Sequence, residues 1–92
     1  LGTAKAQTAL VNTASRNDLD LLPRMAALHA LERTLMNRRL LLTRKEILLQ
    51  YDRYNASKNL DKPTQKLLAS ILDTIEKRML LERSAETTKD GN

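Results

Sequence analysis

The chain has 92 residues and a formal net charge of +5, and its apolar content is almost entirely aliphatic, with no Trp, no Phe and only two Tyr. That length allows one small domain, and the presence of only two Gly and two Pro favours long helices over a turn-rich β fold. The absence of Cys excludes a disulfide framework and thiolate metal sites, and no stretch approaches the roughly 20 apolar residues that cross a bilayer.

Residues 1–16 are small and mostly polar and do not resemble a secretory signal peptide. We therefore expect an intracellular protein, with nucleus and cytoplasm both open. The pattern allows a helix from Ala4 to Ala14 with Leu10 and Val11 as its only bulky anchors. Without docking, this N-terminal segment is expected to be flexible.

A helical domain is predicted over residues 17–83. Asn17, Asp18 and Asp20 are candidate N-caps, and Pro23 suits a first helical turn. The apolar residues that follow recur at spacings of three and four, which predicts an amphipathic helix: Leu21, Met25, Leu28, Leu31 and Leu35.

Three consecutive leucines, Leu40, Leu41 and Leu42, interrupt this pattern, because one helical face cannot hold three adjacent residues. The apolar positions downstream lie roughly 120° away from the first stripe around the helix axis. The leucines therefore indicate a change between two packing surfaces.

Two arrangements fit that change. In one, the helix breaks, Thr43 caps a new helix, Glu46 completes a capping box, and Leu42 with Ile47 forms a hydrophobic staple. In the other, one helix runs from about residue 21 to residue 55, since no Gly or Pro stands after Pro23 in that interval.

Residues 55–62 carry turn chemistry and predict an exposed loop between antiparallel helices. Asp61 can cap the next helix and Pro63 can sit in its first turn. That helix presents a second apolar stripe through about Glu82: Leu68, Ile71, Leu72, Ile75 and Met79. Residues 84–92 contain no apolar residue beyond Ala85 and predict a disordered C-terminal tail.

The predicted fold is therefore all-α: a small helical hairpin or three-helix bundle with flexible N- and C-terminal tails. Its core is expected to combine residues of both stripes with two from the segment between them: Leu28, Leu31, Leu35, Ile47, Leu48, Leu68, Ile71, Ile75 and Met79.

The sequence gives no support for an enzyme. Its one histidine, His29, has no cluster of His, Asp or Glu at helical spacing that would make a metal site or a general base. No Gly-rich phosphate loop is present. We predict no catalytic residue, no metal and no cofactor.

The expected function is a protein–protein interaction module. The leucines of the middle segment point in too many directions for one partner helix to cover, which predicts an exposed apolar patch with a basic rim. The predicted binding residues are Arg38, Arg39, Leu41, Arg44, Lys45 and Leu49. Such a surface favours an acidic or amphipathic helix of another protein, and a second copy of the chain is a further candidate partner.

The alternative is a small basic nucleic-acid-binding domain, because residues 33–66 hold nine basic residues against three acidic ones. The basic residues spread around the helix instead of forming a stripe, and only Tyr51 and Tyr54 could stack on bases. A membrane-surface helix is disfavoured because acidic residues interrupt the basic faces.

The segments "TRKEILLQYDRYN" and "QKLLASILDTIEK" are similar to the two-helix region near the C-terminus of the Always early family of cell-cycle transcription regulators. The matching positions are Lys45, Glu46, Asn55, Gln65, Ala69, Ile71 and Glu76. The resemblance implies a helical pair that acts as a scaffold in a transcription or chromatin complex. The loop here is several residues shorter, the motifs suit any amphipathic hairpin, and no site residue is carried over.

Overall fold

The computed structural model describes residues 3–90, with side chains through residue 85. This part of the chain holds four α-helices, one short 3-10 helix and no strand, which confirms the all-α class. The four α-helices are one more than the predicted three-helix bundle has and two more than the predicted hairpin has. The elements are α1 (Ala4–Ser15), α2 (Leu21–Asn37), α3 (Arg44–Ala56), η1 (Ser57–Asn59) and α4 (Lys62–Asp90).

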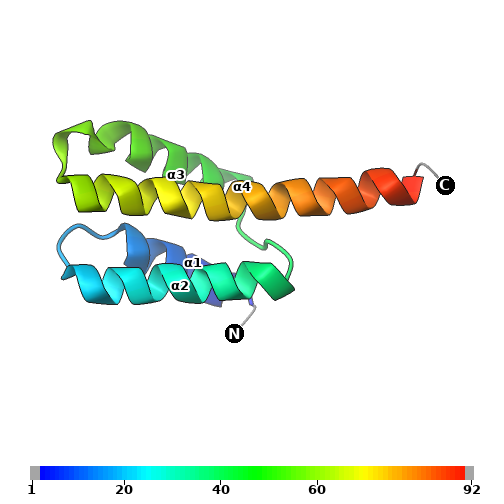
Figure 1. Ribbon diagram of the computed structural model, residues 1–92, viewed down its shortest axis with the longest axis horizontal. Coiled ribbons are helices and arrows are strands. Elements are labelled where there is room, and N and C mark those ends of the chain that lie inside the picture. The colour runs from blue at the N-terminus through cyan, green and yellow to red at the C-terminus, as the bar shows by residue number, and fades with distance from the viewer. Residues whose placement is uncertain (1–2, 91–92) are drawn as a thin grey trace.

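The helices form two antiparallel hairpins, α1 with α2 and α3 with α4, which lie against each other (Figure 1). A non-helical segment, residues 38–43, joins the hairpins, and its first and last residues, Arg38 and Thr43, have an extended backbone. The second helix of each hairpin, α2 and α4, starts at the same end of the bundle, so these two helices run parallel. They are also in contact with each other. The C-terminal part of α4, drawn in orange and red, extends past the ends of the other three helices (Figure 1).

The additional helix is α1, within the segment expected to be flexible unless docked. Thr3 caps it by accepting a hydrogen bond from the Ala6 amide at 3.1 Å. Val11 and Ala14 are buried in the common core. The sequence allowed this helix over almost the same residues, and both of its bulky anchors are used, since Val11 is buried and Leu10 packs at the core margin. The other buried residues of α1, Gln7 and Ala14, are polar or small, so they give no apolar periodicity that would predict docking.

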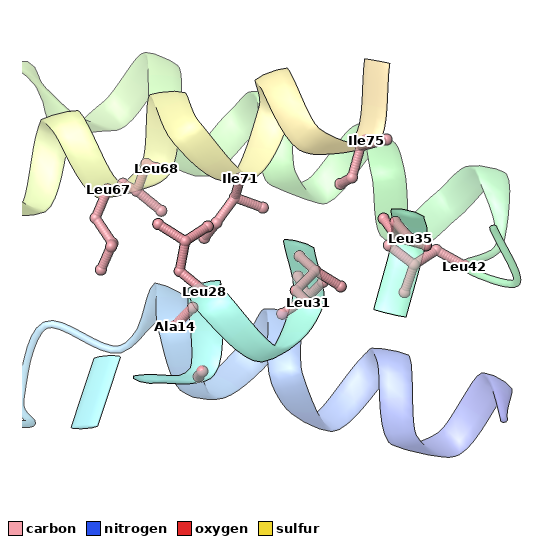
Figure 2. Packing of buried hydrophobic residues seen from close by; sticks show 11 residues of the cluster. Ala14, Leu28, Leu31, Leu35, Leu42, Leu67, Leu68, Ile71 and Ile75 are labelled. Atoms are coloured by element: carbon pink, nitrogen blue, oxygen red, sulfur yellow. The ribbon is translucent and has the colours of Figure 1, made fainter. Parts of the chain in front are cut away.

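The core lies between the two hairpins (Figure 2). Its buried members are Val11, Ala14, Ala27, Leu28, Leu31, Leu35, Leu42, Leu67, Leu68, Ile71 and Ile75, with Leu10, Leu40 and Ile47 packed at its margin. Two predicted core residues are wrong: Met79 is 41% exposed and Leu48 is 54% exposed. Leu48 lies two residues before buried Gln50, so it points to a different side of α3. Met79 lies one turn after Ile75 on the same side of α4, toward the part of that helix that extends past the other helices (Figure 1).

The three leucines lie where the chain breaks between α2 and α3, as in the first predicted arrangement, but the break is longer than expected because residues 38–43 are not helical. Leu40 is half-buried, Leu41 is exposed and Leu42 is buried. Side chains of an extended chain point alternately to opposite sides, so the segment buries its first and third leucines and exposes the second.

The predicted helix break at Thr43 is confirmed. The Thr43 side chain accepts a hydrogen bond from the Glu46 amide at 3.1 Å, and the Thr43 amide donates to the Glu46 carboxylate at 2.9 Å. This is a complete capping box. Both members of the predicted staple, Leu42 and Ile47, belong to the core cluster.

The connection between α3 and α4 lies at residues 55–62, as predicted, but one of its residues is unexpectedly buried. Asp61 caps α4, accepting from the Thr64 amide at 3.1 Å and from the Thr64 hydroxyl at 2.8 Å. Ser57, however, is buried instead of exposed, and its hydroxyl donates to the Tyr54 carbonyl. The backbone of α4 is helical to Asp90 and residues 91–92 lie outside the described residues. The disorder of residues 84–92 stays a prediction.

Candidate interaction surface

The non-helical segment between the hairpins is held by side chains from two helices. Gln7 of α1 donates from Nε2 to the Arg39 carbonyl and accepts at Oε1 from the Leu41 amide, both at 2.8 Å. Glu82 of α4 accepts from the Leu40 amide at 2.8 Å. These contacts satisfy backbone groups of a non-helical segment that would otherwise depend on water.

Arg78 extends this network to the end of α2. Its guanidinium donates to Glu82 at 2.8 Å and to the Leu35 carbonyl at 3.3 Å. A cation at a helix C-terminus interacts favourably with the unpaired carbonyls there. Burial alone would raise the pKa of Glu82, but the hydrogen bonds from Leu40 and Arg78 outweigh it and hold the pKa below its ordinary value. The network therefore fixes α2 beside α4.

A groove lies between these two parallel helices. The α2 residues that line the groove are spaced so that they share one side of that helix, and the α4 residues that line it lie on the turns that face α2. The lining residues are His29, Glu32, Arg33, Leu35, Met36, Thr74, Lys77, Arg78 and Leu81. Buried Leu35 lies beneath, whereas Met36 and Leu81 are 74% and 59% exposed. We call this set of residues the α2–α4 groove.

The charge of the α2–α4 groove is positive. Arg33, Lys77 and Arg78 contribute three cations, against one carboxylate from Glu32. Arg78 is hydrogen-bonded to Glu82 and to the end of α2, whereas Arg33 on α2 and Lys77 on α4 are exposed. The groove thus combines exposed apolar side chains with cations on both banks.

The residues predicted from sequence lie elsewhere on the surface. Leu41 and Leu49 are each 44% exposed, which an apolar binding patch requires, and Arg38, Arg39, Arg44 and Lys45 are also exposed. Arg38 borders a different depression, between α1 and α2. Whether these six residues bind a partner stays a prediction.

His29 lies in the α2–α4 groove, beside Glu32 and Arg33. No group of three or more His, Cys, Asp or Glu side chains comes together in the described part of the chain in a way that could hold a metal ion. Among the residues described, no helix is long and apolar enough to cross a membrane.

A polar cluster at the opposite end of the bundle, formed by buried Arg24, buried Thr64 and exposed Asp61, has a structural role. Arg24 of α2 donates to the Thr64 hydroxyl at 2.6 Å, and Thr64 is held by Asp61. The hydrogen bonds from Thr64 are the main reason that the pKa of Asp61 is lowered, with a smaller contribution from the charge of Arg24. Since each of the three side chains is paired with another, the cluster joins the first turns of α2 and α4.

Two groove residues escaped the sequence analysis, Met36 and Leu81. Met36 directly follows the last residue of the first stripe, and Leu81 ends the run Met79-Leu80-Leu81. That run carries the same signal as the three leucines, because three adjacent apolar residues in a helix cannot share one buried face. It was the available indication of an exposed apolar surface on α4.

Comparison with protein-family models, curated proteins and solved structures finds no match to this chain. The resemblance to the Always early family therefore gains no support, and function is argued from the geometry alone.

Proposed function

We propose that this protein is a protein–protein interaction module that binds an acidic amphipathic helix of another protein in the α2–α4 groove. The observation that carries the proposal is the exposure of Met36 and Leu81 on neighbouring parallel helices. Two large apolar side chains held in water beside a groove are typical of an interaction site.

A groove between two packed helices suits a third helix. An amphipathic helix docks in such a groove through residues at positions i, i+3, i+4 and i+7. Here Leu35 would lie beneath the docked helix, with Met36 on one bank and Leu81 on the other. This is the same type of surface, apolar with a basic rim, that the sequence predicted around Leu41 and Leu49.

The sign of the charge selects the partner. Arg33 and Lys77 lie on opposite banks and are both exposed, so acidic residues flanking the apolar stripe of a docked helix would meet a cation on either side. Such complementarity raises the association rate and excludes basic helices more than it adds affinity.

The test uses fluorescence anisotropy with labelled peptides of about 14 residues, roughly 21 Å long as helices. One peptide has Leu at i, i+3, i+4 and i+7 and Glu at most other positions, and the other replaces each Glu by Lys. We expect the 92-residue protein to bind the acidic peptide and to discriminate against the basic one. Affinity should fall moderately with salt, because the rim is exposed.

Two matched double variants locate the site. Met36→Ser with Leu81→Ser should weaken binding more than about tenfold, because each buried side chain of this size is worth roughly 1.5 to 3 kcal/mol. Leu41→Ser with Leu49→Ser is the control and tests the surface predicted from sequence. If only the control variant loses binding, the α2–α4 groove is not the binding site.

The nucleic-acid alternative is a separate outcome. Neither peptide would then bind, whereas single-stranded RNA or duplex DNA would bind with an affinity that falls steeply as salt rises. That result would overturn the proposal.

A further inference from the structure

The opposite side of α4 carries a second exposed surface, which the α2–α4 groove does not use. It lies between α3 and α4 and is lined by Tyr51, Glu76, Met79, Leu80 and Arg83. Met79 is 41% exposed and Leu80 is 61% exposed. We call these five residues the α3–α4 face.

The four α4 residues of this face form one stripe. At 100° per residue, Met79, Leu80 and Arg83 all fall within about 60° of Glu76 around the helix axis. The only hydrogen bond described for Glu76 comes from the Tyr51 hydroxyl, at 2.6 Å, which holds Tyr51 of α3 at the margin of the stripe. The same bond is the main reason that the pKa of Tyr51 is raised.

The stripe is complementary to itself. Its acidic end, Glu76, and its basic end, Arg83, lie on either side of the apolar centre formed by Met79 and Leu80. If a second copy of α4 packs antiparallel with its two-fold axis between residues 79 and 80, each Glu76 faces the partner's Arg83. Each Met79 then faces the partner's Leu80.

We infer that the α3–α4 face docks a second copy of this chain, with the two α4 helices antiparallel and related by a two-fold axis. A two-fold interface uses the same patch on both subunits, and this patch satisfies that condition in both charge and apolar content. Parallel packing would place Glu76 against Glu76 and Arg83 against Arg83, so like charges disfavour it.

The position of the face in the fold leaves room for a second copy. The C-terminal part of α4 extends beyond the other helices (Figure 1), so a second α4 can lie along this part without displacing the bundle. Because the ion pairs are at the surface, they set the register and direction, while burial of Met79 and Leu80 supplies most of the attraction. The surface is distinct from the α2–α4 groove, and its test is independent of the proposed function.

The test is analytical ultracentrifugation of the 92-residue protein and two charge reversals, Glu76→Arg and Arg83→Glu. We expect the unaltered protein to dimerise and each reversal to weaken the dimer more than about tenfold, because like charges then face each other twice. An equimolar mixture of the two variants should form a heterodimer, since opposite charges face each other again. The double variant Glu76→Arg/Arg83→Glu should regain the homodimer.

The control is Arg33→Glu, which changes the net charge as Arg83→Glu does but lies on α2, and it should dimerise like the unaltered protein. Circular dichroism verifies that each variant folds. If a reversal does not fold, Leu80→Cys provides a second measurement, because the chain has no other thiol. Two thiols near the two-fold axis should form an intermolecular disulfide on oxidation, whereas Leu49→Cys should not.

Three results would overturn the inference. One is a protein that stays monomeric up to about 1 mM. The second is a pair of reversals that dimerise as well as the unaltered protein, which would place the interface elsewhere. The third is a mixture that does not restore association, which would exclude the antiparallel register.

Discussion

Truncating two isomeric side chains, Ile75 of α4 and Leu48 of α3, tests which faces of these helices are buried. Ile75 and Leu48 were both predicted to be core, and in the structure Ile75 is fully buried whereas Leu48 is 54% exposed. Substituting either by Ala removes the same three carbon atoms. Ile75→Ala and Leu48→Ala are therefore chemically matched, and the structure predicts different costs.

The expected magnitudes follow from burial. At about 0.8 kcal/mol per methylene, Ile75→Ala loses about 2.4 kcal/mol of transfer free energy. A residual cavity of up to roughly 75 Å³, at about 24 cal/mol per Å³, adds up to about 1.8 kcal/mol. We expect the free energy of unfolding to fall by about 2.5 to 4 kcal/mol. For Leu48→Ala, the buried fraction scales the transfer term to about 1 kcal/mol, and an exposed site leaves no cavity.

The measurement is urea unfolding followed by circular dichroism at low protein concentration, so that association does not contribute. If Ile75→Ala is already unfolded without urea, Ile75→Val gives a graded substitute with an expected cost of roughly 0.5 to 1.5 kcal/mol. Equal costs for Ile75→Ala and Leu48→Ala would refute the assignment of the buried faces of α3 and α4.

Three further predictions concern helix ends and the docking of α1. Thr43→Ala should lower the free energy of unfolding by about 1 kcal/mol through loss of the capping box, and a thermal melt with an unchanged midpoint would contradict this. Gln7→Leu removes both hydrogen bonds to residues 39–41, so amide exchange should accelerate in α1 and in that segment while the protection of Ile71 is retained; uniform acceleration would mean that α1 does not open separately. The hydrogen bond from Thr8, followed by that from the Thr43 amide, lowers the pKa of Glu46 below its ordinary value. The stabilisation by the Glu46 carboxylate is therefore present above the pKa of the unfolded state and is lost as the pH falls through the pKa of the folded state. Glu46→Gln should then reduce the loss of stability below about pH 4.5. An acid-unfolding curve that Glu46→Gln leaves unchanged would refute this link between the Glu46 pKa and stability.

The character of the α2–α4 groove could be predicted from the sequence, but the residues that form it could not. A basic chain with too many leucines for one buried face indicated an exposed apolar patch with a cationic rim. The α2–α4 groove has that character, yet it is built from Met36, Leu81, Arg33 and Lys77. It exists because α2 and α4 lie parallel and in contact, a relation that joins residues about forty positions apart and leaves no local pattern.

The sequence alone determined the all-α class of the fold and supplied the residues that cap α3 and α4, although at Thr43 it also allowed a continuous helix. The reason is physical: a helix starts where a side chain satisfies amides within three residues, as Thr43 and Asp61 do, and that chemistry is local. Tertiary structure decided which faces are buried. It placed α1 against the bundle through Gln7, Val11 and Ala14, and it left Met79, Leu80 and Leu81 exposed in the second half of α4. Burial depends on neighbours far away in the chain, and the apolar positions of a single helix do not specify whether a neighbour is there to cover them.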